Sequence, residues 1–517
     1  MRLPRISLPL AAAVTTSAHP HLSTIVRDIP RRLRVLPAPK QPPRRSAAPS
    51  AQPARAQAKA APLSEAELRK RVMGLALPAI GEQLLTLGVG VSDTFLAGHL
   101  SQSAVAEIGY GRATALAAVG VAATAVWVVL NAFFAVNIGV TALVARATGA
   151  QDKPLAARAA GQGLLLGCLA GLLMLVLSMP LALGIAHALG VSGQVASLAA
   201  VYIRVFSLAA PATGIASACT AAMRGAGDAR RPLLVMLLVN GANIAGSWTL
   251  MNGFAPLGIH PIGVVGSAIG AATGWTIGMV LAVSLLSRAH PRAPRLRWAA
   301  LRPDRDVAFR ILHVGLPSAA EIGVFQLGLV AFGRVVVGLG ATAYAANVSI
   351  NTVESLGVLP GFGFAVATTA LVGQALGAAD PELAVRVVWS ALRPCVAMMG
   401  AIGLVALLLP QLLLGLFVAD ASVLSAGGIA MRLSCLTLPA AGVAFIFNGA
   451  LRGSGDTKFP VVVRATGTWG LRVPLATALI PFMALPGARL AMAIDFCTQA
   501  GLSYWRFRSG RWRKARV

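Results

Sequence analysis

Five carboxylates interrupt long apolar stretches of this 517-residue sequence, at Glu82, Asp93, Glu321, Glu354 and Asp495. An ionised carboxylate in the middle of a membrane helix costs about 2.5–3.5 kcal/mol on insertion scales. Acids at such positions usually face a cavity or a partner, where they can take up and release a proton or help to cage a monovalent cation. These residue types therefore indicate cation binding inside a membrane.

Asp93, Glu321 and Glu354 are the residues to which we assign cation coupling, with any monovalent cation site near Asp93, whereas we expect Asp495 to be structural. Glu82 precedes Asp93 by three helical turns, so the two acids share one helix face about 16 Å apart along the axis. Glu82 and Glu321 each stand four residues after the proline of a Leu-Pro pair. The symmetry of these positions predicts that the two glutamates face one another.

Uncharged amides accompany these acids. Asn347, Asn351 and Glu354 follow an i, i+4, i+7 pattern, which places them on one polar stripe of a helix. A lone amide in a membrane helix can equally form a purely structural interhelical hydrogen bond worth less than about 2 kcal/mol. With that alternative open, we assign the following residues to a cavity that binds substrate: Glu82, Gln83, Asn131, Asn243, Gln326, Asn347 and Asn351.

Twelve apolar stretches of membrane-spanning length position these side chains in a chain that is 56% hydrophobic and 12% charged. Backbone groups in hydrocarbon must be paired within their own segment, so the stretches are expected to be helices. The predicted spans are 72–98, 115–145, 156–182, 196–222, 232–252, 262–287, 310–338, 344–372, 384–409, 424–451, 459–484 and 487–506. The expected fold is an all-α integral membrane protein of twelve transmembrane helices in two pseudo-symmetric six-helix lobes.

A duplication supports the two lobes. Arg204–Pro232 matches Arg432–Pro460 at 12 of 29 positions without a gap, at an offset of 228 residues. Internal repeats of this kind are typical of transporter folds. The glycines of the repeated RG(A/S)GD motif permit a positive φ at a helix end, its arginine can meet the helix terminus or lipid headgroups, and its aspartate can cap the next helix. The motif residues are Arg224, Gly225, Gly227 and Asp228, and Arg452, Gly453, Gly455 and Asp456.

Basic residues divide the connections between spans into two sides. One side has most of the arginines and lysines, and the other has only Arg112, Arg334 and Arg489. This division predicts that both termini lie in the cytoplasm. The expected parts of the chain are a disordered basic arm (1–71), the first lobe (72–287), a cytoplasmic linker (288–309), the second lobe (310–506) and a basic cytoplasmic tail (507–517). The arm has 14 Lys and Arg against three acids, which would also fit a targeting segment or a start site assigned too early.

Several function classes are disfavoured. The formal net charge is +27. The arginines and lysines that produce it lie at the span ends and in the arm, where they can anchor a membrane protein, so we expect no nucleic-acid partner. The five cysteines lie singly in apolar segments, which argues against a metal centre or a disulfide framework. The sequence lacks the HExxH motif of zinc proteases, a glycine-rich phosphate loop and the GxSxG motif of serine hydrolases. We therefore do not expect the protein to be an enzyme.

The motifs together resemble the multidrug and toxic compound extrusion (MATE) family, in particular its bacterial-type members. The resemblance covers about residues 70–506 and rests on LALPAIGEQLLTLGVGVSDTFLAGHLS, TALVARATGA, RGAGDARRP, RGSGDTKFP, GLPSAAEIGVFQLGLV and NTVESLGVLPGFGFAVATTALVGQALGAADPE. It implies cation-coupled efflux of organic compounds through a central cleft, with Asp93 as the first-helix acid involved in coupling. Archaeal-type members have an acid four residues after an asparagine of the fifth helix, where this chain has Ser247, so H⁺ and Na⁺ both remain open as the coupling ion.

The function expected from these features is a secondary active antiporter that exports small organic compounds, cationic or amphipathic, in exchange for H⁺ or Na⁺. Its expected partners are a small-molecule substrate and the lipid bilayer, it needs no cofactor beyond the coupling ion, and it acts as a monomer. We expect it in the plasma membrane, or in an organelle envelope if the arm is a transit peptide. The alternatives are a flippase for a lipid-linked oligosaccharide, a membrane-embedded enzyme, and a sensor or scaffold that transports nothing.

Overall fold

The structure is a computed structural model of the chain, and it describes residues 63–288, 294–296 and 298–515. The described residues are predominantly helical, and the β-pairing among them is an isolated antiparallel bridge between Phe254 and Ile259. The all-α membrane fold expected from the sequence is confirmed. The predicted arm falls almost entirely outside the described residues.

The helices follow one another with short connections. In the first half of the chain they are α1 (Glu65–Gly98), α2 (Gln102–Ile108), α3 (Arg112–Ala132), α4 (Phe134–Gly149), α5 (Lys153–Ala188), α6 (Gly193–Leu208), α7 (Ala210–Gly225), α8 (Arg230–Asn252), η1 (Ala255–Leu257) and α9 (Val264–Ser287). In the second half they are η2 (Trp298–Leu301), α10 (Arg305–Val337), α11 (Ala341–Gly357), α12 (Leu359–Gly377), α13 (Pro381–Leu408), α14 (Pro410–Gly415), α15 (Ala421–Arg432), α16 (Ser434–Ser454), α17 (Lys458–Ala465), η3 (Thr466–Arg472), α18 (Val473–Arg508) and η4 (Arg511–Lys514).

The described helices account for the twelve predicted spans. Ten segments are long and apolar enough to cross a membrane, and the pair α6 and α7, bent by 54°, makes an eleventh. One of the ten, Lys458–Arg508, crosses twice. Arg472 and Asp495 form an ion pair of 2.6 Å, although 23 residues of straight helix would separate them by about 34 Å. The chain reverses at Ala484, whose φ of 50° is not helical.

Four spans are each built from two helices separated by a single residue, which is Phe133, Ala209, Val358 or Leu433. Pro211 and Pro360 stand in the first turn after two of these breaks. A proline there lacks an N–H and clashes with the preceding turn, so the helix cannot continue straight. The breaks matter for the site because they place helix ends, with their polar side chains, inside the bundle.

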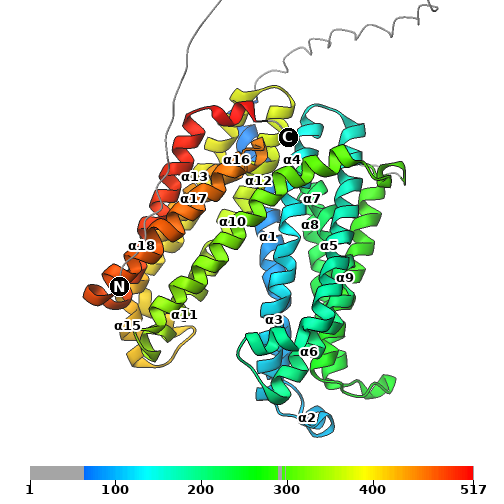
Figure 1. Ribbon diagram of the computed structural model, residues 1–517, viewed down its shortest axis with the longest axis vertical. Coiled ribbons are helices and arrows are strands. Elements are labelled where there is room, and N and C mark those ends of the chain that lie inside the picture. Colours follow the sequence, from blue (N-terminus) through cyan, green and yellow to red (C-terminus); the bar gives the residue numbers. More distant parts are fainter. Residues whose placement is uncertain (1–62, 289–293, 297, 516–517) are drawn as a thin grey trace, which may run out of the picture. The chain divides into compact units, whose positions relative to one another are not determined.

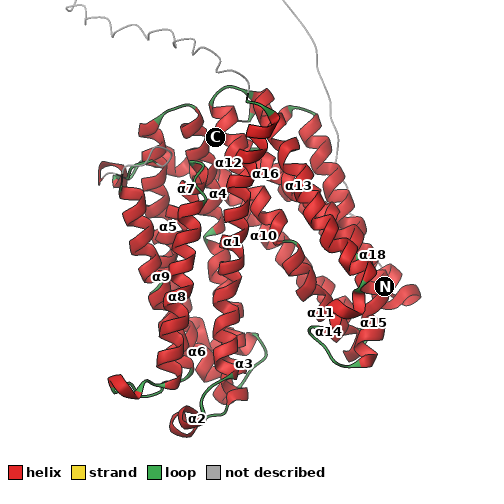
Figure 2. Cartoon of the chain, turned by 180° about the vertical axis from the view of Figure 1, so that it is seen from behind, coloured by secondary structure: helices red, strands yellow, loops and turns green. Residues whose placement is uncertain are grey.

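The two halves contact each other at the end of the bundle that contains Arg224–Asp228 and Arg452–Asp456, which we call the motif end. There α4 and α12 cross, with Gly149 against the carbonyl of Gln374 and Gly377 against the carbonyl of Arg146. These two contacts are equivalent under the 228-residue repeat. Within residues 63–517, both Figure 1 and Figure 2 show the helices of the two halves close together around α4 and α12 and apart around α2 and α15.

Two predicted boundaries differ from the structure. The first helix begins at Glu65, inside the predicted arm, because Ser64 and Glu67 form a capping box that fixes the helix start. The last span was expected to end at residue 506, but α18 continues to Arg508 and is followed by η4, in which Trp512 is buried with its ring stacked on Phe507 at 4.9 Å. Trp512 buries a large apolar side chain away from water, and this burial holds residues 511–515 against the rest of the protein.

Candidate functional site

The five carboxylates singled out in the sequence are all buried, with exposed fractions between 0% and 7%. Four of them form ion pairs with arginine: Glu82 with Arg224, Glu321 with Arg452 and Arg464, Glu354 with Arg489, and Asp495 with Arg472. A buried charge is tolerated when a partner neutralises it and its remaining hydrogen-bonding capacity is met. The ion pairs therefore explain how four of the five acids persist in apolar helices.

Two of these pairs are related by the duplication. Arg224 bonds Glu82 within the first half, and Arg452 Nη2 bonds both carboxylate oxygens of Glu321 at 2.7 Å within the second. The two glutamates were expected to face each other, and the group that each one bonds is an arginine. Each carboxylate pairs with the motif arginine of its own half, because that arginine supplies the cation that burial requires. The expected position of these arginines among headgroups is wrong, since their side chains are 14% and 12% exposed.

The other motif residues have backbone roles, except for Asp456, which was expected to cap the next helix but pairs with Arg506. Gly227 and Gly455 have φ of 87° and 94°, in the left-handed region that favours glycine. Asp228 accepts hydrogen bonds from the backbone N–H of Arg230 and Arg231, at 3.1 and 3.3 Å, at the start of α8. The preceding glycines of the motif, Gly225 and Gly453, lie against the backbone carbonyls of Thr141 and Thr369. The motif is thus a packing and turn element that also contributes a buried arginine.

Asp93 differs from the other four acids. Tyr202 of α6 donates to one carboxylate oxygen at 2.8 Å, and Asn243 and Ser247 of α8 donate to the other at 3.3 and 3.2 Å. Among the described residues, no arginine, lysine or histidine lies within ion-pair distance of it. The Oδ1 atom of Asn243 is buried beside this carboxylate without a hydrogen-bond partner.

Tyr202 was missed in the sequence, although it is one of only four tyrosines in the chain. A tyrosine within an apolar span needs a partner for its hydroxyl, and this requirement is the signal that could have found it. Tyr202 is 3% exposed, and the side chains of Asn243 and Ser247 are fully buried. The site is therefore enclosed by helices of the first half of the chain.

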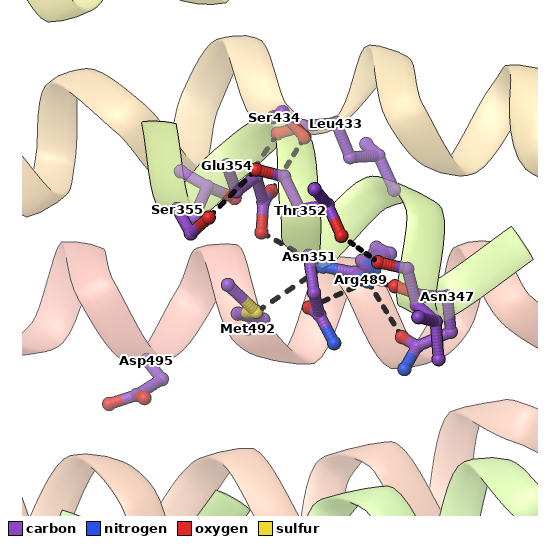
Figure 3. A network of polar contacts seen from close by, with 12 residues as sticks. Asn347, Asn351, Thr352, Glu354, Ser355, Leu433, Ser434, Arg489, Met492 and Asp495 are labelled. Atoms are coloured by element: carbon purple, nitrogen blue, oxygen red, sulfur yellow. Dashed lines mark hydrogen bonds and ion pairs between the residues drawn. The ribbon is translucent and has the colours of Figure 1, made fainter. Parts of the chain in front are cut away.

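The second half has a separate polar network, drawn in Figure 3. Arg489 of α18 donates to Glu354 Oε2 at 2.9 Å, to Asn347 Oδ1 at 2.6 Å and to Asn351 Oδ1 at 3.0 Å. Ser434, the first residue of α16, donates to Glu354 Oε1 at 2.6 Å. The predicted stripe on α11 is therefore real, and the group that it binds is Arg489. The network joins two of the interrupted spans at their breaks.

The position of Arg489 differs from the one assigned to it when basic residues were divided between the two sides of the membrane. This arginine was expected in a connection on the sparsely charged side, but it is 1% exposed and lies inside the bundle. Arg464, near Glu321, is likewise buried. The sequence held a signal for both, because buried glutamates need cations. Which arginine serves which glutamate depends on how the helices pack.

The remaining predicted amides lie outside these networks. Asn131 donates to the carbonyl of Trp127 in its own helix at 2.8 Å, so its hydrogen bond is not the interhelical one raised as the alternative for a lone amide. Gln83 and Gln326 are half-buried, and they follow the ion-paired Glu82 and Glu321 by one and five residues. In the described part of the chain no group of three or more His, Cys, Asp or Glu side chains is arranged to hold a metal ion.

Comparisons with known proteins agree with this architecture. The model of the MatE family matches residues 78–249 and 317–477, once in each half and over more than half of the chain. The probable multidrug resistance protein NorM of Thermotoga maritima is 29% identical over 455 residues, which are 87% of this chain and 94% of that protein. The multidrug resistance protein NorM of Burkholderia vietnamiensis is 30% identical over 447 residues, which are 84% and 92% of the two chains.

A solved structure shares the fold. It is described as an outward-facing conformation of a multidrug resistance MATE family transporter of the MOP superfamily, and it matches with a TM-score of 0.77 at 21% identity over 87% of this chain and 97% of that one. The relatives are named as multidrug resistance proteins and transporters, not as enzymes. The chain belongs to the MatE family of membrane transporters, as the resemblance in its sequence predicted.

Proposed function

We propose that the protein is a secondary active antiporter that exports small organic compounds, cationic or amphipathic, in exchange for H⁺ or Na⁺. The observation that supports this proposal is the environment of Asp93. It is the one acid of the five singled out that has no arginine partner among the described residues, and its three neighbours are uncharged donors.

The physical reason is charge balance. A buried carboxylate without a fixed cation is stable only when a proton neutralises it or a mobile cation binds beside it. The hydroxyls of Tyr202 and Ser247 and the amide of Asn243 hold the carboxylate in place in either state without neutralising it. Asp93 can therefore exchange its cation, whereas the acids paired with arginine are already neutralised.

Both coupling ions fit this geometry. A proton needs only the carboxylate itself. A sodium ion needs several oxygen ligands. The Oδ1 atom of Asn243, which has no hydrogen-bond partner, would be one such ligand in addition to the carboxylate oxygens of Asp93. The proposal therefore includes H⁺ and Na⁺, and it assigns coupling to Asp93. Glu321 and Glu354, which we also predicted to couple cations, are proposed to fix helices through their arginines.

We further propose that the motif end faces the cytoplasm, because the basic connections gather there. The close glycine contacts between α4 and α12 at that end support a conformation closed to the cytoplasm. In the proposed cycle, substrate enters from the cytoplasm, the halves rock, and substrate leaves as a cation binds at Asp93. The Asp93 site is complete within one chain, so we propose that the protein acts as a monomer in the plasma membrane.

The test is efflux from proteoliposomes under separately imposed pH and Na⁺ gradients, with a panel of cationic dyes. Asp93→Asn preserves the size of the side chain but removes the charge, so we expect ion-driven efflux to be lost while membrane insertion and helix content stay normal. Tyr202→Phe removes one hydrogen bond and should shift the ion concentration needed for half-maximal rate while transport persists.

Asp420→Asn is the matched control, because it is the same substitution at a carboxylate that lies outside the spans and accepts hydrogen bonds from Ser422. It should transport like the unmodified protein. Ion-driven efflux at the unmodified rate by Asp93→Asn would refute the assignment. The gradient that drives efflux in the unmodified protein decides between H⁺ and Na⁺.

A further inference from the structure

A cavity of about 300 Å³ lies at the motif end of the second half, away from Asp93, where His313 of α10, Lys458 of α17 and the end of the chain meet. Arg506 of α18 and Arg511 and Lys514 of η4 complete its basic lining. The antiport mechanism proposed above uses none of these residues. The cavity was not foreseen, because its basic residues come from three segments that are far apart in the sequence.

The lining has an excess of positive charge. Its one carboxylate, Asp456, is ion-paired with Arg506 at 2.7 Å. Lys458, Arg511 and Lys514 have no carboxylate within ion-pair distance among the described residues. Within the part of the chain that the structure describes, the cavity therefore presents three cations that no carboxylate compensates. Exposed like charges normally spread apart when their segments are free to move, so something must hold them together.

The end of the chain is held in place by contacts that do not involve these cations. Trp512 is 1% exposed, stacks on Phe507 at 4.9 Å, and donates from its indole to the carbonyl of Phe507 at 2.7 Å. The carbonyl of Ala515, which also lines the cavity, accepts a hydrogen bond of 3.1 Å from Arg146 of the first half. These contacts fix Arg511 and Lys514 beside Lys458 at the cost of their mutual repulsion.

The duplication shows that this arrangement is specific to one half. At the equivalent position in the first half, Asp228 accepts hydrogen bonds from the first-turn N–H groups of α8. In the second half, Asp456 turns to Arg506 instead, and α17 has no side-chain cap. Lys458, the first residue of this uncapped helix, lines the cavity, so the positive end of the helix adds to the cationic field.

We propose that this cavity is a binding site for a phosphate-bearing anion. The observations that support it are a cavity of about 300 Å³, three cations that have no acidic partner among the described residues, a segment held in place by Trp512, and an uncapped helix terminus. A phosphate offers several strong acceptor oxygens to such a cluster. The anion is either the headgroup of an anionic phospholipid, since basic clusters at helix ends bind such headgroups, or a soluble phosphate.

The experiment titrates the purified full-length protein in neutral detergent, by calorimetry, with dihexanoyl phosphatidylglycerol, dihexanoyl phosphatidylcholine and inorganic phosphate. Saturable binding of phosphatidylglycerol but not of phosphatidylcholine identifies a lipid source. Binding of inorganic phosphate without binding of phosphatidylglycerol identifies a soluble source. Either result supports the site, and binding of neither anion refutes it.

The variant that locates the site is Lys458→Ala with Lys514→Ala. Each lysine near an anionic group is worth about fivefold in affinity, or about 1 kcal/mol, so the pair should weaken anion binding about 25-fold. The matched control is Lys153→Ala with Arg230→Ala, which removes two exposed basic residues at the motif end of the first half, including the repeat equivalent of Lys458. The control should change the affinity less than twofold. Equal weakening in both double variants would show general charge attraction and would overturn the proposal.

A second readout addresses the chain end. Bound anion should slow trypsin cleavage after Arg511, which is retained in both variants, because its side chain would be engaged in the cavity. The control variant should retain this protection, and the double lysine variant should lose it. Protection that is identical in both variants would also count against the site.

Discussion

Replacing Arg489 by methionine tests the polar network of the second half. The guanidinium donates to Glu354, to Asn351 and twice to Asn347 at 2.6–3.0 Å, and both members of the ion pair are nearly inaccessible to water, at 2% and 6%. Removing one partner of a buried pair leaves an uncompensated charge and costs about 3–5 kcal/mol. We therefore expect Arg489→Met to lower the free energy of unfolding by that amount.

A second substitution, Glu354→Gln, removes the carboxylate charge that Arg489→Met leaves unpaired. In the double variant Arg489→Met with Glu354→Gln, the network retains only unmet hydrogen bonds, which cost about 1–3 kcal/mol. The double variant should therefore be about 2 kcal/mol more stable than Arg489→Met alone. The assay is equilibrium unfolding in mixed micelles of neutral detergent and sodium dodecyl sulfate, followed by helix content.

Arg334→Met is the control, since it removes an exposed arginine from α10 and should change stability little. The reasoning is refuted if the destabilisations of the two single variants at Arg489 and Glu354 simply add in the double variant. The same proteins test the role of Glu354. Ion-driven efflux that persists in the double variant supports a structural role, whereas loss of coupling with stability regained would restore Glu354 as a coupling residue.

Three further predictions concern packing and charge. Arg224→Met should cost about 3–5 kcal/mol, and Arg452→Met should cost less, because Arg464 remains 3.7 Å from the same glutamate. Gly149→Ala should cost about 1–3 kcal/mol through overpacking, because a Cβ there would overlap a backbone carbonyl of α12. Hydrogen bonds from Ser422 and the backbone lower the pKa of Asp420, so its ionised form contributes stability above the unfolded pKa, and this contribution is lost as pH falls through the folded pKa.

The measurements for these predictions are equilibrium unfolding for the first two and thermal unfolding as a function of pH for the third. Gly184→Ala controls for Gly149→Ala, because a Cβ at Gly184 meets nothing within 4 Å, and it should not destabilise the protein. Asp420→Ala should lower the melting temperature at neutral pH and leave it unchanged at acid pH. Equal costs at Arg224 and Arg452, equal costs at the two glycines, or a pH-independent effect at Asp420 would contradict the respective prediction.

The helices and the burial of the acids could be predicted because both depend on local properties. The length of an apolar run decides whether a helix can cross a membrane, and this rule found all twelve spans, including the reversal at Ala484 that separates the last two. The spacing of Asn347, Asn351 and Glu354 fixed their common helix face, because side chains three and four residues apart point the same way. Of the four motif glycines expected to permit a positive φ, Gly227 and Gly455 have one, whereas Gly225 and Gly453 belong to helices α7 and α16.

The partners of the buried acids could not be predicted in the same way. Tyr202 lies 109 residues from Asp93, and Arg489 lies 135 residues from Glu354. Which side chains meet over such separations depends on the rotation and crossing of whole helices, to which many contacts contribute. For this reason the sequence alone suggested that Glu82 and Glu321 face each other, whereas each pairs with an arginine of its own half.

The amino-acid sequence by itself determined that the chain is a duplicated helical membrane protein with carboxylates inside its spans, since hydropathy, period and repeat are properties of the linear chain. Only the tertiary structure decided which of those carboxylates already has a cation. Packing brings an arginine to four of them and three uncharged donors to Asp93. A buried charge is stable only with a neutralising partner, so this difference singles out Asp93 as the place for an exchangeable ion.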